Sequence, residues 1–240
     1  MNATDQSSAQ GGLRQWALGY FSRGFTLRDN ILLVGARQLN SDGTYSSTGA
    51  GRVEVYTKNG DFQGLITCPA GDDSDERFGS SLAVKEGRIV IGAPDASTVQ
   101  GTNDRGKAYV FDYSGNLIAT LEAPNPNDSY YSSSLRFGST VEIDSGKIFV
   151  SEPFWDAGAF VTSHGKIHVF DLDGNRLGAL TPQTANGSEH MGAGVISASN
   201  GVLVEAGGGL GSDNGFIWRY PHTQHYMARR SEMKYGRSGS

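Results

Sequence analysis

The stretch Arg77-Phe-Gly-Ser-Ser-Leu-Ala-Val-Lys-Glu-Gly-Arg-Ile-Val-Ile-Gly-Ala-Pro94 recurs without a gap as Arg136-Phe-Gly-Ser-Thr-Val-Glu-Ile-Asp-Ser-Gly-Lys-Ile-Phe-Val-Ser-Glu-Pro153. The same frame starts again at Phe21 and, with a one-residue shift in the turn, at Met191. The four origins lie 54 to 59 residues apart. This period is longer than that of most helical solenoids and suits the blade of a β-propeller.

A second block repeats in step with the first. It is a glycine followed by a short strand that ends on an aromatic residue, at Gly51–Tyr56, Gly106–Phe111, Gly165–Phe170 and Gly215–Tyr220. In the first three repeats Asn-Gly, Ser-Gly or Asp-Gly follows, which predicts type I′ hairpin turns. Each repeat therefore predicts four strands, about sixteen in all, and no window shows sustained helical periodicity. The aromatic residues that end the third strands are expected to pack between blades.

The expected fold is all-β, a propeller of four four-stranded blades that start near residues 21, 78, 137 and 191. The four blades either close as a ring or form half of a larger propeller shared by two copies. We expect residues 1–12 to be a flexible leader, 13–220 the propeller and 221–240 a basic tail. Either residues 13–18 or residues 225–229 would supply the closing strand of the last blade.

Composition narrows the function. The formal charge of −5 over 240 residues does not favour nucleic acid. No run of about eighteen apolar residues predicts a membrane helix, and residues 1–12 lack the basic and apolar segments of a secretory signal. The C-terminal residues are basic, and a docking tail for an acidic partner surface is expected at Arg229, Arg230, Lys234 and Arg237.

The spacing of Phe78-Gly79 and Gly92-Ala93-Pro94, with the following Gly106–Phe111 strand, resembles the FG-GAP repeats of integrin α-subunit propellers and their bacterial and phage relatives. The resemblance covers about Phe21 to Tyr220 and is best in the second and third repeats. It implies a β-propeller, although integrin propellers have seven such blades and this chain holds four.

The resemblance also raises calcium, which integrin-type propellers hold in Asp-rich loops between first and second strands. Those positions are short turns here, at 85–87 and 144–146, so no cofactor is expected. Residues 171–175 are interpreted as a turn rather than a calcium loop. An acidic cluster remains as a weak candidate for oxygen ligands, formed by Asp72, Asp73, Asp75 and Glu76.

Loop length predicts the interaction surface. The short first-to-second and third-to-fourth connections must share one face of the disc, because successive strands alternate in direction. The long connections then share the other face, where binding residues tend to lie. The candidate binding residues on this face are Tyr45, Tyr130, Tyr131, Phe154, Trp155 and Asp156. The alternative interpretation is that these aromatic side chains fold back over blade edges.

Three functions are compatible with these features. The first is a noncatalytic module that binds protein partners, the second a carbohydrate-binding adhesin for host attachment, and the third a glycan-acting hydrolase. No zinc-type histidine spacing, nucleophile elbow or phosphate loop occurs. A hydrolase would need two juxtaposed carboxylates, for which the second-strand ends offer Asp95, Glu152, Asp156 and Glu205. An enzyme is not expected.

The expected location is the surface of a phage virion, as a head decoration or tail-associated part. This reconciles relatives that act outside cells with a chain that shows no export signal. A cytoplasmic or extracellular protein is the alternative. The expected partners are other virion proteins, with surface glycans or a second copy of the chain as further candidates.

Overall fold

The computed structural model describes residues 24–45, 49–71, 75–97, 105–124, 135–156, 164–181, 190–194, 196–199, 202–205 and 216–219. Within these ranges the chain forms fifteen β-strands and no helix. The strands make four antiparallel sheets that follow chain order. The prediction of an all-β, propeller-like fold built from one repeated unit is confirmed.

Each of the first three sheets holds four strands in sequential order. The first contains β1 (Phe25–Arg28), β2 (Ile31–Ala36), β3 (Arg52–Thr57) and β4 (Phe62–Thr67). The second contains β5 (Ser81–Lys85), β6 (Arg88–Ala93), β7 (Lys107–Asp112) and β8 (Leu117–Leu121). The third contains β9 (Val141–Asp144), β10 (Lys147–Glu152), β11 (Lys166–Asp171) and β12 (Arg176–Leu180).

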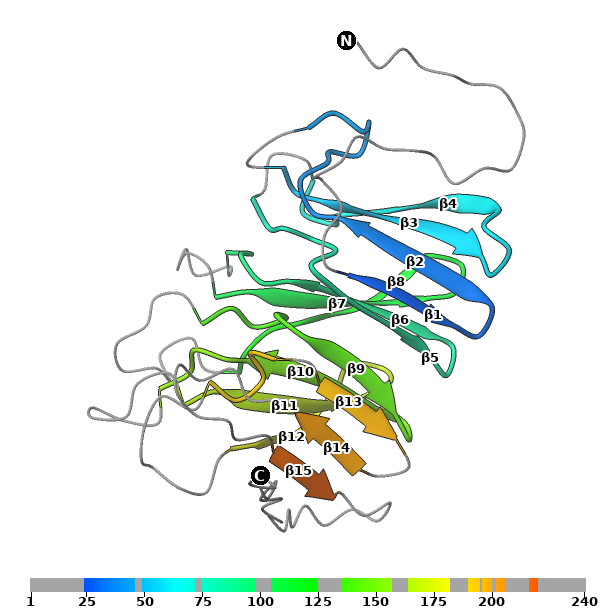
Figure 1. Ribbon diagram of the computed structural model, residues 1–240. Coiled ribbons are helices and arrows are strands. Elements are labelled where there is room, and N and C mark those ends of the chain that lie inside the picture. The colour runs from blue at the N-terminus through cyan, green and yellow to red at the C-terminus, as the bar shows by residue number, and fades with distance from the viewer. Residues whose placement is uncertain are drawn as a thin grey trace, which may run out of the picture.

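The described part of the fourth sheet has three strands, β13 (Ile196–Ser199), β14 (Val202–Glu205) and β15 (Phe216–Arg219). Both segments expected to add its last strand lie outside the described residues, as do the leader and the tail. Figure 1 shows the sheets following one another from β1–β4 at the top to β13–β15 at the bottom. The first strands of successive sheets contact each other, β1 with β5, β5 with β9 and β9 with β13.

The two kinds of hairpin turn differ, and this corrects the prediction. The type I′ conformation, with positive φ at both central residues, occurs between first and second strands, at Asp29-Asn30, Glu86-Gly87 and Ser145-Gly146. In the turns predicted as type I′, only the glycine has positive φ (Gly60, Gly115 and Gly174). The pairing register shifts one residue further along in all three sheets. These are longer turns that end in a glycine bulge.

The hydrophobic core lies between sheets. One cluster joins Leu33 and Val53 of the first sheet to Ile89 and Ile91 of the second, and equivalent clusters join the second sheet to the third and the third to the fourth. Each blade buries about one face against each neighbour, so a single blade has no core of its own. Tyr56, Phe111 and Phe170 are buried, and Phe111 and Phe170 belong to these clusters, as predicted for them.

The repeat origins connect one blade to the next. Phe78, Phe137 and Met191 are fully buried. Their backbone N–H groups donate to the preceding blade, at Ala50 (2.7 Å), Arg105 (2.8 Å) and His164 (3.0 Å). The Phe-Gly segment therefore works as a clamp between blades. Because the same contact is made at three junctions between blades, this stretch recurs more closely than other parts of the sequence.

Candidate interaction surface

The two faces of the blade array differ in the length of their connections. At one face, strands are joined by two or four residues; at the other, by ten to nineteen. Figure 1 shows the tight hairpins at the right and the longer connections at the left. We call these the turn face and the long-loop face. The predicted separation of short and long connections is therefore present in the structure.

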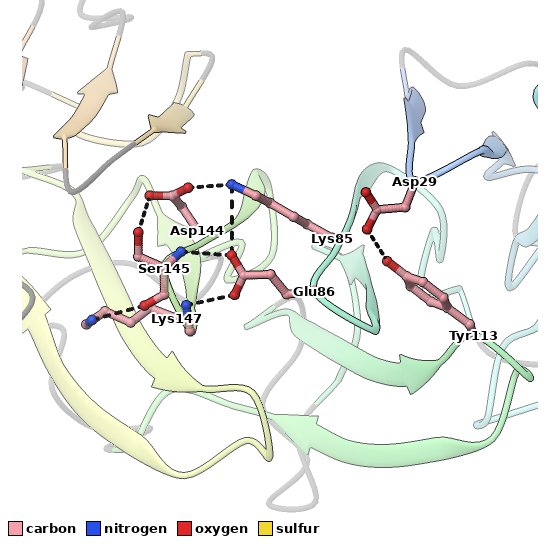
Figure 2. Close-up of polar contacts among 8 residues, drawn as sticks. Asp29, Lys85, Glu86, Tyr113, Asp144, Ser145 and Lys147 are labelled. Carbon is pink, nitrogen blue, oxygen red and sulfur yellow. Dashed lines mark hydrogen bonds and ion pairs between the residues drawn. The ribbon is translucent and has the colours of Figure 1, made fainter.

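Contacts between neighbouring blades occupy the turn face, as Figure 2 shows. Lys85 on β5 pairs with Asp144 on β9. The carboxylate of Glu86 accepts hydrogen bonds from the backbone N–H groups of Ser145 (3.0 Å) and Gly146 (2.8 Å). The polar groups at the tips of β5–β6 and β9–β10 thus bind each other rather than an external ligand.

The tips of third-to-fourth turns reach the preceding blade on this same face. The Tyr113 hydroxyl donates to Asp29 (2.6 Å) in the β1–β2 turn. Burial, followed by the hydrogen bond to Asp29, raises the pKa of Tyr113 to about 12. One blade further on, Arg88 donates to Asp173 (2.9 Å). The turn Asp171–Asn175 is closed by its own side chains, since Asp171 accepts hydrogen bonds from the backbone N–H groups of Asp173 and Asn175, as its interpretation as a turn requires.

At the long-loop face, a polar cluster lies where the first and second blades meet. Glu76 is 4% exposed and accepts hydrogen bonds from the hydroxyl of Tyr109 (2.5 Å) and the thiol of Cys68 (3.2 Å). The Lys107 ammonium lies 3.6 Å from Glu76 and 3.8 Å from Glu122. Burial and the neighbouring Glu76 raise the pKa of Tyr109 far above its usual value, so its phenol stays protonated and donates.

A shallow open hollow of roughly 460 Å³ adjoins this cluster. It is lined by Pro69, Ala70, Lys107, Tyr109, Thr120 and Glu122. Its charged groups, Lys107 and Glu122, already form an ion pair.

The third blade holds a buried pair at the equivalent height. The Nε2 atom of His168 lies 2.7 Å from the Glu152 carboxylate, and the two side chains are 0% and 2% exposed. Burial lowers the pKa of His168 despite the favourable contact with Glu152. The ring is therefore neutral and donates its Nε2–H to Glu152. Because both groups are enclosed, they join strands β10 and β11 and do not face a substrate.

The structure places the predicted aromatic residues of the third blade beside charged groups. Phe154 is half-buried between the Arg136 guanidinium, 5.6 Å from its ring centre, and the His190 ring, 5.5 Å away. The Lys166 ammonium lies 3.8 Å from the centre of the Trp155 ring, a cation–π contact. Asp156 is 3% exposed, so its carboxylate faces inward.

The remaining candidates fall into two groups. Tyr45 is 49% exposed and forms an isolated bridge with Leu39, and Asp75 is exposed. The other predicted site residues lie outside the described residues, namely Tyr130, Tyr131, Asp72, Asp73, Arg229, Arg230, Lys234 and Arg237. In the described ranges no three His, Cys, Asp or Glu side chains gather as metal ligands would. Glu76 is held by Tyr109, Cys68 and Lys107 instead.

Sequence reasoning missed the buried polar row that includes Tyr109 and His168. These residues and Glu54 share one position of the third strand, as the strand register shows. The signal was present, since a polar or ionisable residue recurs at this position between two apolar residues in all three strands. Its meaning depends on partners that differ in each blade, Arg52 for Glu54 (2.8 Å), Glu76 for Tyr109 and Glu152 for His168.

Comparisons with known proteins agree with this architecture. Residues 67–111 match the FG-GAP repeat. The match runs from the end of β4 into β7 and contains the Phe78-Gly79 clamp and the Gly92-Ala93-Pro94 segment at the end of β6. The chain thus carries an FG-GAP repeat within a propeller-like fold.

Among solved structures, the chain is similar to the computationally designed Ika4 protein, with 14% identity and a TM-score of 0.50. The likeness covers 86% of this chain and 95% of that one, and at such identity it concerns the fold alone. A search of the curated proteins gave no match. The part of the chain that the structure describes contains no helix able to cross a membrane.

Proposed function

We propose that this protein is a noncatalytic interaction module that binds protein partners through its long-loop face, as an assembly component on the surface of a phage virion. The carrying observation is the unequal use of the two faces. Short turns bind one another across blades, whereas connections of ten to nineteen residues gather on the opposite face of the same framework. Long connections on a rigid framework commonly carry binding residues.

The aromatic residues that the structure describes on the long-loop face suit a protein partner. Trp155 and Phe154 are held by Lys166, Arg136 and His190, so little side-chain freedom is lost when they meet a partner. Aromatic and Arg side chains fixed in this way are typical of binding hot spots. The virion location is supported by the resemblance to phage-type FG-GAP proteins and by the basic residues after position 219, which suit attachment to an acidic neighbour.

Quantitative mass spectrometry of purified phage particles tests the proposal. We expect the protein at a fixed copy number per particle, and Trp155→Ala to lower that number at least tenfold. Leu117→Ala is the matched control, because Leu117 is 47% exposed but lies on the outer strand β8. A protein found only in the unassembled fraction would overturn the virion assignment.

A glycan array separates the carbohydrate-binding alternative. Sugar binding by the parent chain that Trp155→Ala abolishes would replace the protein-binding assignment with an adhesin. Circular dichroism of each variant confirms that the sheet content is retained, since removal of the Trp155 ring costs a cation–π contact of about 0.5–2 kcal/mol.

A further inference from the structure

The first blade exposes the face that every later blade buries. On β1, Phe25 is 77% exposed and Leu27 is 54% exposed. By their pairing with β2, at Phe25↔Val34 and Leu27↔Leu32, both belong to the face of the first sheet turned away from the second. Leu32 and Val34 on this face are half-buried. We call this surface the leading face.

The equivalent positions of the next two blades are covered. In the second blade they are Leu82, Val84, Ile89 and Ile91, of which the last three are at most 1% exposed. In the third they are Val141, Ile143, Ile148 and Val150, at most 3% exposed. In both cases the covering surface is the opposite face of the preceding blade, which we call its trailing face. Within the described blades, the surface that packs against a leading face is therefore the trailing face of another blade.

Exposure of the outer strand does not distinguish the first blade. Phe62 on β4 is 45% exposed, but its equivalent Leu117 on β8 is 47% exposed, and Leu177 on the outer strand β12 is 43% exposed. Only the inner strand β1 departs from the pattern. Phe25 and Leu27 make this face apolar, and in repeat proteins such a face is normally covered by a neighbouring repeat.

The surface that would match it lies at the other end of the chain. On β13, Ile196 and Ala198 pack against the third blade, whereas Ser197 and Ser199 are exposed on the opposite, trailing face. Among the described strands, no contact comparable to those of β1 with β5, β5 with β9 or β9 with β13 joins β13 to β1. Figure 1 shows the first and fourth sheets at opposite ends of the row.

We propose that the leading face of the first blade docks on the trailing face of the fourth blade of a second copy of this chain. Two copies placed head to tail then close one ring through two identical contacts. Closure within one chain would bring β13 against β1, and the described strands make no such contact comparable with those between the other first strands. Head-to-tail contacts that close leave no further surface for growth.

Sedimentation velocity of the full chain over a concentration series tests this assembly, independently of any binding by the long-loop face. We expect a species of twice the chain mass. Leu27→Lys should yield monomers and raise the dissociation constant at least about 100-fold, since an apolar residue becomes a charge in two contacts at once. Leu117→Lys is the matched control and should leave the dimer intact. A parent chain that is monomeric at 100 µM, or that forms an open series of larger species, overturns the proposal.

A charge exchange tests the pairing of the two faces. Ser197→Glu alone should also weaken the dimer, and a mixture of the Leu27→Lys and Ser197→Glu chains should recover it. If Ser197→Glu has no effect while Leu27→Lys dissociates the dimer, two leading faces meet each other and the head-to-tail ring is wrong. Unchanged sheet content and melting of the monomeric variants exclude simple misfolding as the cause.

Discussion

Gly106 lies directly against the backbone of Phe137, so that a Cβ atom on Gly106 would overlap the Phe137 carbonyl oxygen and amide nitrogen. Gly51 meets Phe78, and Gly165 meets Met191, in the same way. The glycine that opens each third strand and the repeat origin of the next blade therefore form one contact. This contact explains why the glycine before each third strand recurs together with the Phe-Gly or Met-Gly segment that begins the next repeat.

Gly106→Ala should destabilise the fold much more than Gly115→Ala. Both glycines have φ near +80°, so both substitutions carry about 1–2 kcal/mol of left-handed strain. Nothing lies within 4 Å of a Cβ on Gly115, whereas Gly106→Ala must also move two blades apart. Urea unfolding measures the difference, and equal losses would show that the blade contact tolerates a side chain.

The buried phenol of Tyr109 should contribute more to the free energy of unfolding than the more exposed phenol of Tyr113. Tyr109→Phe removes a donor to Glu76, which is 4% exposed, and we expect a loss of about 2 kcal/mol. Tyr113→Phe removes a hydrogen bond to the exposed Asp29, and the loss should stay below about 1 kcal/mol. Thermal unfolding of both variants checks the order, which would be reversed if the turn-face contact held the blades more strongly.

Glu86 should contribute to blade docking although it lies at the surface. Its carboxylate accepts two backbone N–H groups of the next blade, and charge-assisted bonds of this kind are stronger than neutral ones. Glu86→Ala is expected to cost about 1–2 kcal/mol. The control Asp173→Ala, whose side chain is 71% exposed, should change stability by less than about 0.5 kcal/mol. Equal effects in denaturant titrations would contradict this reading.

Glu142 should make stability fall as the pH rises. Burial raises its pKa from 4.5 to about 6, against the opposing effect of Arg28. The folded state therefore holds this proton more tightly than the unfolded chain, and stability is lost between pH 4.5 and pH 6. The full difference amounts to at most about 2 kcal/mol, less after solvent screening.

Glu142→Gln should thus raise the melting temperature at pH 7.5 and have little effect at pH 4. Differential scanning calorimetry at both pH values measures this. A gain of equal size at both values would mean that Glu142 acts through packing rather than through its charge.

Much of the fold followed from repetition. The eighteen-residue stretch and the glycine-to-aromatic strand that recurs in step with it together predicted four-stranded units, the all-β class and the separation of short from long connections. Residues such as Phe78 and Phe137 were also predictable as framework, because the same residue type recurs at the same point of each repeat. Turn geometry was less predictable from the sequence. Asn59-Gly60 has the sequence signature of a type I′ turn but lies in a hairpin whose pairing register shifts by one residue.

Sequence by itself determined the blade, because short apolar strands and the glycine-containing turns between them act locally and recur in each repeat. Tertiary structure decided which copies of that pattern are covered. Leu27 and Val84 occupy the same position of their repeats, yet Leu27 is exposed and Val84 is buried, because only Val84 has a described blade in front of it. Tertiary structure also decided the partners of Tyr109 and His168, since those come from segments 33 and 16 residues away in the chain and differ between blades.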